Sequence, residues 1–385
     1  MQFAKLVLRN ALRHKLRTAL TVLGLVVAIA SFGLLQTVVG AWYAGAESAA
    51  PTRLVTRNAV SLVFPLPLGY RDKIRSVDGV RSVSYANWFA GIYQDPKNFF
   101  PQLAVEPRTY FDMYRDYLVP ADDFVAFLRD RKGAVIGRKL ADTHRLKVGD
   151  VMPLRGTIYP GTWEFTIRAI YDGAEQKTDT SQMFFHWDYL NETVKKRGRG
   201  RADQVGIYLV DVTDADRAAE VSQAIDALFR NSLAETLTET ERAFQIGFVK
   251  QTEALVVAIR IVSYVVIAII LAVMANTMAM TARERLAEYA TLKALGFSPA
   301  FVAALIFGES LAIAAVGAAA GIALTFPVGD WFAQRVGTLI PVFEVSAQTV
   351  ALQALCALAV GVAAAIIPGR RAARVRIVEG LRAVG

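Results

Sequence analysis

The sequence has very few of the residues from which disulfides and metal sites are built. Its 385 residues include one cysteine, Cys356, and three histidines, His14, His144 and His186. A single cysteine excludes an internal disulfide, and no two histidines have the His-x-x-x-His spacing of a helical metal site. We therefore expect neither a disulfide framework nor a metal centre.

Motifs for catalysis and nucleotide binding are absent as well. The sequence contains no Gly-x-Ser-x-Gly elbow, no Ser-x-x-Lys pair and no Gly-x-x-x-x-Gly-Lys-[Ser/Thr] loop, which cradles ATP phosphates. Two pairs of acidic neighbours, Asp122 with Asp123 and Asp172 with Glu175, fit exposed loop or helix-cap positions better than a catalytic pair. We predict a chain that is not an enzyme, binds no cofactor itself and leaves any ATP and Mg²⁺ to a partner chain.

What the sequence does contain is long apolar runs. Four of them, at residues 18–42, 254–280, 300–325 and 350–367, are long enough to cross about 30 Å of hydrocarbon at about 1.5 Å per residue. About two hundred mixed residues separate the first run from the second. A cleaved signal peptide is the alternative for the first run, but its apolar part would be only about 7–15 residues long. The pattern predicts an α-helical integral membrane protein with four transmembrane helices and a large domain inserted after the first.

Positive charge is concentrated beside these runs. Residues 1–17, 281–298 and 368–385 together carry 13 Lys and Arg and three acidic residues, whereas the whole chain has a net charge of +9. Lys and Arg are retained in cytoplasmic flanks. We therefore expect a multi-pass membrane protein with both termini cytoplasmic, the inserted domain and the loop 326–349 on the outer side, and no nucleic-acid partner. The basic run 195–201 falls in the inserted domain and is expected to be an exposed loop; a lipid or nucleic-acid patch is the alternative.

The inserted domain, residues 43–237, alternates β-rich runs with amphipathic stretches. This alternation predicts an α/β or α+β domain. We expect strands at 59–64, 80–85, 103–105, 134–136, 151–154, 164–169, 182–185 and 205–210, and helices at 68–76, 121–131, 138–143, 187–195 and 214–231.

The last two apolar runs contain features of closely packed membrane helices. Gly317 and Gly321 form a Gly-x-x-x-Gly pair and Gly361 lies in the fourth run, so we expect these glycines to let a neighbouring helix approach. An interface between subunits is the less favoured use of the same surface. Glu309 is an acid well inside the third run, where a charge costs on the order of 2.5–3.5 kcal/mol. We expect it to bond to a neighbouring helix; a place in a substrate or proton path is the alternative.

A long uninterrupted stretch precedes the cytoplasmic connection. Residues 238–281 contain no proline and one glycine, which predicts a continuous stalk helix that includes the second transmembrane segment. It leads into the segment 282–299, which ends at Gly296-Phe-Ser-Pro.

Four stretches resemble the FtsX-like permeases, the MacB and LolC/LolE type of ABC transporter subunit. They are residues 276–299 (NTMAMTARERLAEYATLKALGFSP), residues 10–24 (NALRHKLRTALTVLG), the tail (PGRRAAR from 368, VEGLR from 378), and GAVIGRKLA from 133 with LKVGD from 146. The last is similar to a MacB-like periplasmic core domain. The resemblance implies a permease domain at about 254–380. It also implies a place in the bacterial inner membrane, with the inserted domain periplasmic or extracellular.

The resemblance also implies partners and a mechanism. Such a permease pairs with itself or with a second permease, sits on cytoplasmic ABC ATPase subunits of the LolD or MacB type and, in some systems, meets a periplasmic adaptor; membrane lipid surrounds it. ATP-driven motion would be transmitted to the outer domain for export or extraction of a lipid, lipoprotein, peptide or toxic compound. The alternative is an FtsX-like scaffold acting on a cell-wall hydrolase. The residues expected to contact the ATPase are Arg283, Glu284, Arg285, Glu288, Lys293 and Gly296.

Overall fold

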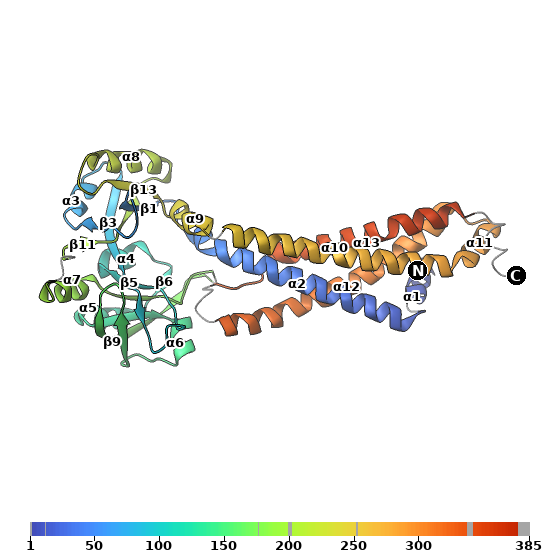
Figure 1. Ribbon diagram of the computed structural model, residues 1–385, viewed down its shortest axis with the longest axis horizontal. Helices are drawn as coiled ribbons and strands as arrows, with labels where there is room; N and C mark the ends of the chain where they lie inside the picture. Colours follow the sequence, from blue (N-terminus) through green and yellow to red (C-terminus); the bar gives the residue numbers. More distant parts are fainter. Residues whose placement is uncertain are drawn as a thin grey trace. The chain divides into compact units, whose positions relative to one another are not determined.

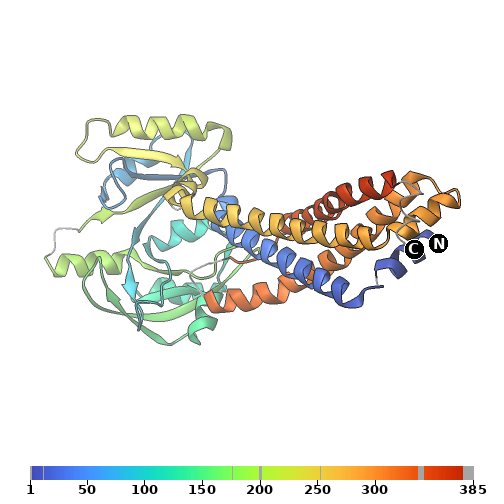
Figure 2. The same cartoon turned by 45° about the vertical axis from the view of Figure 1, so that its right-hand side comes forward.

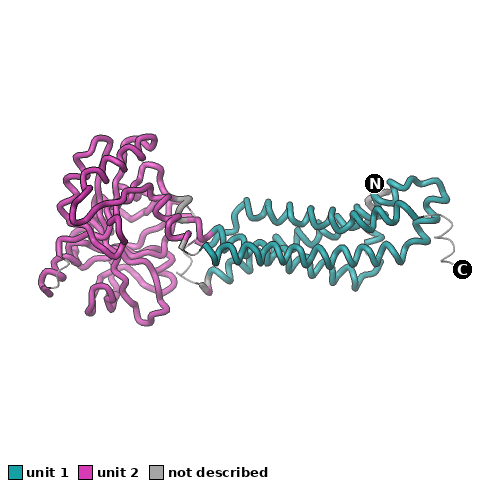
Figure 3. The backbone as a smooth tube through the Cα atoms, turned by 45° about the horizontal axis from the view of Figure 1, so that its top comes forward, with its two compact units in different colours: residues 1–40, 253–334, 343–385 teal, residues 41–252, 335–342 magenta. Residues whose placement is uncertain are grey.

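The computed structural model describes residues 2–11, 13–175, 177–198, 202–251, 253–336 and 342–375, which form two compact units (Figure 3). The first, here called the helical unit, comprises residues 1–40, 253–334 and 343–385. The second, the α/β unit, comprises residues 41–252 and 335–342. Most of the α/β unit thus lies between the first two apolar runs.

Four long helices make up the helical unit: α2 (Lys15–Ser48), α10 (Glu253–Glu284), α12 (Pro299–Val336) and α13 (Ala347–Arg374). Each contains one of the predicted apolar runs, and all four are long and apolar enough to cross a membrane. They run side by side in Figures 1 and 2. The prediction of four transmembrane helices is confirmed.

Two short helices lie together at one end of this bundle, α1 (Gln2–Ala11) and α11 (Leu286–Ala294) (Figure 2). Gly296 ends α11 with a positive φ of 92°, which glycine adopts without strain. The N–H of Phe297 then donates to the carbonyl of Leu292, and the N–H of Gly296 to that of Lys293. This is a Schellman stop, and it explains why a glycine stands at this point of the sequence.

Small residues let the long helices approach closely. A Cβ atom at Gly321 would lie 2.9 Å from Cβ of Ile29 on α2, and one at Gly361 would lie 2.8 Å from Cβ of Ala314. Gly317 likewise faces Leu25 of α2. The glycine faces are therefore occupied within this chain, by packing of α12 on α2 and of α13 on α12.

Two buried polar contacts cross the same helices. The hydroxyl of Ser310 donates to the carbonyl of Gly361 over 2.6 Å. The amide nitrogen of Gln353 on α13 donates to the carbonyl of Ile29 and to the hydroxyl of Thr325, each over 2.8 Å. Because hydrocarbon offers no competing partner, such bonds help to fix which helices are neighbours.

The α/β unit is built on one mixed sheet of 11 strands in the order β13-β1-β12-β3-β5-β10-β7-β9-β8-β4, with β6 beside β9. Its pairs are antiparallel except β5 with β10 and β7 with β9. The strands are β1 (Arg53–Asn58), β3 (Val80–Trp88), β4 (Gly91–Ile92), β5 (Gln102–Val105), β6 (Tyr117–Leu118), β7 (Gly133–Gly137), β8 (Val151–Gly156), β9 (Gly161–Gly173), β10 (Met183–His186), β12 (Ile207–Val212) and β13 (Thr236–Thr240); β2 (Leu66–Pro67) and β11 (Gln204–Val205) pair separately.

Helices cover this sheet: α3 (Tyr70–Arg75), α4 (Pro107–Met113), α5 (Ala121–Arg129), α6 (Arg138–His144), α7 (Trp187–Lys196) and α8 (Ala218–Leu228), the last after a 3₁₀ turn (Ala215–Arg217). Successive side chains of a strand point to opposite faces. Phe184 and Phe185 accordingly belong to two different apolar clusters. Seven of the eight predicted strands and all five predicted helices overlap observed elements, so the α/β assignment is confirmed.

The strand predicted at 59–64 is wrong. Its apolar residues Val60, Val63 and Phe64 are exposed in a loop. The observed strand is β1, which ends just before residue 59. Its arginines interrupt the apolar pattern by which a strand is recognised. Arg53 and Arg57 are matched by Glu241 and Glu239, so their charges are tolerated in a strand.

The stalk helix begins later than predicted. Thr238 lies in β13, where its hydroxyl is 2.9 Å from that of Thr56, and α9 (Glu241–Gln251) starts only at Glu241. Cross-strand pairing with β1 overrides the helical pattern here. Thr252, between α9 and α10, lies outside the described residues, so a single continuous rod stays a prediction.

The packing of α12 on α2 predicts that adding a methyl group at Gly321 lowers the stability of the protein. Gly321→Ala forces a Cβ against Ile29, and overpacking of this kind costs about 1–3 kcal/mol. We expect a lower thermal unfolding midpoint in detergent for this variant. Gly40→Ala is the matched control, since a Cβ there meets nothing within 4 Å; equal midpoints for the two variants would contradict the packing.

Candidate functional site

Ion pairs join the start of α2 to the end of α10 and the start of α11. Arg17 donates both guanidinium NH₂ groups to the carboxylate of Glu284, each over 2.8 Å, and Arg13 pairs with Glu288. Both the arginines and the acids are four residues apart. His14 adds a longer contact, 3.8 Å from Nε2 to Glu284. The N-terminal segment is thereby tied to the segment predicted to contact an ATPase.

A buried ion pair continues this cluster into the bundle. The Nη1 of Arg285 lies 3.0 Å from Oε2 of Glu309 on α12, and its Nε lies 2.9 Å from Oε2 of Glu288. Arg285 is 7% exposed and Glu309 4% exposed. Glu309, expected to bond to a neighbouring helix, thus has a basic partner, which the sequence did not reveal because Arg285 stands at a helix break. Arg285 faces the bundle.

Electrostatics at Glu288 reflect both of its partners. Partial burial favours the neutral acid, but the hydrogen bonds from Arg285 and Arg13 outweigh it and lower the pKa of Glu288 below its usual value. The carboxylate therefore stays charged at neutral pH and links the exposed arginine to the buried one.

Lys293 connects this cluster to the fourth long helix, α13. Its ammonium donates to the main-chain carbonyls of Ala373 and Val375, the latter over 2.8 Å. These carbonyls belong to the end of α13, where a cation is favoured by unpaired C=O groups and by the helix dipole. We call Arg13, Arg17, Glu284, Arg285, Glu288, Lys293 and Glu309 the basic-end cluster.

The cluster changes which predicted residues are accessible. Glu284, Arg285, Glu288 and Lys293 are held by partners within the chain, and Gly296 serves as a helix stop. Glu284 is still exposed, and so are the side chains next to that stop: Leu295 is 72% and Phe297 43% exposed. We call these two residues with Gly296 the α11 tip. Arg283 is also exposed.

Some of these roles had a signal in the sequence. The four-residue spacing of Arg13 and Arg17 matches that of Glu284 and Glu288, and Gln353 is the only amide in the fourth apolar run. Neither spacing nor composition indicates which segments are in contact, so the sequence alone does not predict these ion pairs.

A second buried ion pair lies within the α/β unit. Nε of Arg53 is 2.6 Å from Oε2 of Glu241, and the hydroxyl of Tyr114 donates to Oε1 over 2.7 Å. Burial, reinforced by Glu241, raises the pKa of Tyr114 well above its usual value, so it remains a donor. Arg53 follows α2 and Glu241 begins α9, so the cluster joins the two points where the chain enters and leaves this unit.

The other candidates of the sequence are structural. Asp172 accepts two hydrogen bonds from Arg138, and Asp122 and Asp123 lie in the first turn of α5. Within the basic run, Lys195 pairs with Asp203. Arg197 packs over the ring of Trp163. Residues 199–201 lie outside the described residues.

Four membrane-spanning helices with one large domain between the first and second define a permease-type membrane protein. Residues 18–228 match the family described as MacB-like periplasmic core domain, and residues 260–377 match FtsX-like permease C-terminal. The chain belongs to this family of ABC transporter permeases.

Individual relatives are distant. The chain is 23% identical to an uncharacterized ABC transporter permease of Methanocaldococcus jannaschii over 322 residues, which cover 80% of this chain and 77% of that one. Similar solved structures are the periplasmic region of MacB from Actinobacillus actinomycetemcomitans (9% identity, TM-score 0.36, 54% of this chain and 95% of that one) and the extracellular domain of the noncanonic ABC-type transporter YknZ from Gram-positive bacteria (12%, 0.35, 49% and 100%).

The buried pair of Arg285 and Glu309 predicts a non-additive mutant cycle. Either single change to Met leaves a buried charge with a lost partner, which costs about 3–5 kcal/mol. The double variant removes both charges and is expected to regain most of the thermal unfolding midpoint in detergent. Strictly additive losses would show that the two side chains do not form this pair.

Proposed function

We propose that this chain is a non-catalytic permease subunit that couples ATP hydrolysis on a separate ABC ATPase to a conformational change of its α/β unit. The supporting observation is the basic-end cluster, which connects the ends of α2, α10, α11, α12 and α13 and leaves the α11 tip exposed beside it. ATP and Mg²⁺ would be held by the ATPase.

The cluster suits transmission of a displacement. A push on α11 reaches α12 through Arg285 and Glu309, and reaches α13 through Lys293. Breaking the buried pair would leave the carboxylate of Glu309 buried without its cation, while Arg285 kept only Glu288. The lowest-energy response is therefore movement of the connected helix ends together.

The buried pair of Arg53 and Glu241 provides a receiving point in the α/β unit. Since it fastens the entering segment to the leaving one, the two connections would act on the sheet jointly. The unit would then change its contact with an envelope substrate, such as a lipid, lipoprotein, peptide or toxic compound.

The arrangement in the membrane follows from charge. We propose that the basic end is cytoplasmic in a bacterial inner membrane, that the α/β unit is periplasmic, and that two permeases assemble on two ATPases, as a homodimer or a heterodimer; an adaptor protein could join them outside. An FtsX-like scaffold for a cell-wall hydrolase is the alternative, and the match to a MacB-like core domain favours transport.

Association with the ATPase is expected to depend on the α11 tip. Leu295→Asp places a charge on an exposed apolar side chain without disturbing the core, so folding should persist while co-purification with the ATPase falls at least about tenfold, the factor for about 1.4 kcal/mol. Leu233→Asp, at a fully exposed leucine of the α/β unit, is the control. Undiminished co-purification of the tip variant would refute the proposed docking surface.

A charge swap separates internal support from direct ATPase contact at Glu284. Glu284→Arg should impair transport-coupled ATPase activity, since it repels Arg17. Adding Arg17→Glu restores the pair with reversed polarity, and recovery of coupled activity is expected. If the double variant stays as impaired as the single one, Glu284 acts on the partner and not on Arg17.

A further inference from the structure

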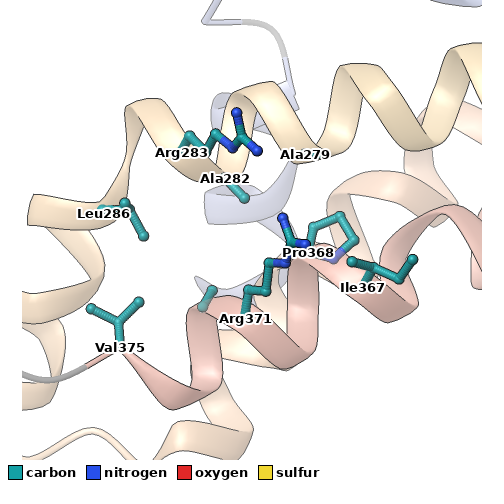
Figure 4. Close-up of a pocket in the computed structure, with 9 residues that line it drawn as sticks. Ala279, Ala282, Arg283, Leu286, Ile367, Pro368, Arg371 and Val375 are labelled. Carbon is teal, nitrogen blue, oxygen red and sulfur yellow. The ribbon is translucent and has the colours of Figure 1, made fainter.

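A pocket lies between α10 and α13 at the basic end of the helical unit. Its volume is about 280 Å³, and Figure 4 shows its walls. The pocket exists because alanines, whose side chains are small, stand where the two long helices face each other. The lining residues are Ala279, Ala282, Arg283, Leu286, Ile367, Pro368, Arg371, Ala372 and Val375.

The lining combines apolar walls with positive charge and no acid. Arg283 on α10 and Arg371 on α13 stand on opposite walls and are both exposed (Figure 4). Neither has a hydrogen-bond or ion-pair partner among the residues that the structure describes. Glu284, the acid next to Arg283 in the sequence, pairs with Arg17. These two cations thus differ from the arginines of the basic-end cluster.

The depth of the pocket points to its occupant. It lies where the candidate spans Glu253–Glu284 and Ala347–Arg374 both end, and the ends of membrane-spanning helices lie near the lipid headgroups. A phosphate matches a pair of guanidinium groups, and acyl carbons match Ala279 and Ile367, which lie on the span side of the two arginines. An acidic protein side chain would use the arginines but leave the apolar walls without a partner.

We propose that this pocket binds one anionic phospholipid, with its phosphate between Arg283 and Arg371 and the start of an acyl chain along the apolar wall. A bound lipid would hold the ends of α10 and α13 together on the side of the bundle that opens to the membrane. The inference does not depend on the identity of the ATPase.

The test is a titration of the purified full-length protein with phosphatidylglycerol, followed by native mass spectrometry, with phosphatidylcholine in parallel. Loss of one arginine near a lipid surface weakens binding about fivefold, from about 1 kcal/mol per residue. We expect about that loss for Arg283→Gln and for Arg371→Gln, and about 25-fold for the double variant. Arg370→Gln, an equal charge loss on the same helix outside the pocket, should bind like the native protein.

Two further variants test the walls and a competing occupant. Ala279→Leu fills the pocket without changing charge, and should weaken phosphatidylglycerol binding as well. Truncation after Val375 should leave it unchanged; a tenfold rise would identify residues 376–385 as the occupant and overturn the proposal.

Three other results would also overturn it. The first is equal binding of phosphatidylglycerol and phosphatidylcholine. The second is equally strong competition by glycerol phosphate alone, which would show that the apolar wall contributes nothing. The third is native phosphatidylglycerol affinity of the Arg283→Gln/Arg371→Gln variant together with lost co-purification of the ATPase, which would assign the arginines to a protein contact.

Discussion

The ion pair between Arg285 and Glu309 is the constraint around which the helical unit is arranged. A buried carboxylate at this position requires a cation, and the cation has to come from a neighbouring segment. The chain supplies it by interrupting the helix after Glu284, so that Arg285 turns inward and α11 starts in a new direction. The helix break between α10 and α11 thus places Arg285 within reach of Glu309 on α12.

Close packing and polar hydrogen bonds have different roles in the rest of the bundle. Gly321 and Gly361 bring backbones together without saying which register is correct, because any small residue permits approach. Ser310 and Gln353 bond to particular carbonyls, and those bonds are lost if a helix slides or rotates. Dispersion therefore supplies contact, and a few directed bonds supply the register.

The sequence predicted what depends on composition and period, and failed where distant segments meet. Apolar runs located all four spans, and alternation located most strands. The strand β1 was missed because Arg53 and Arg57 look unsuited to a sheet until Glu241 and Glu239 are placed beside them. Around Glu284 the sequence predicts a surface for a partner protein, and only the fold shows that Arg13, Arg17 and Glu309 form ion pairs with Glu288, Glu284 and Arg285 in the same chain. A charged side chain in a strand or span indicates that an oppositely charged partner is needed, but only the fold shows which residue is that partner.

This distinction gives the remaining charges their meaning. At the basic end, the acids among the described residues already have arginine partners: Glu284 pairs with Arg17, Glu288 with Arg13 and Arg285, and Glu309 with Arg285. Arg283 and Arg371 are left beside an apolar pocket. Two cations beside an apolar pocket repel each other, and an anion between them would offset that repulsion. The paired arginines thus hold the helices in place, and Arg283 and Arg371 stay available for the proposed lipid phosphate.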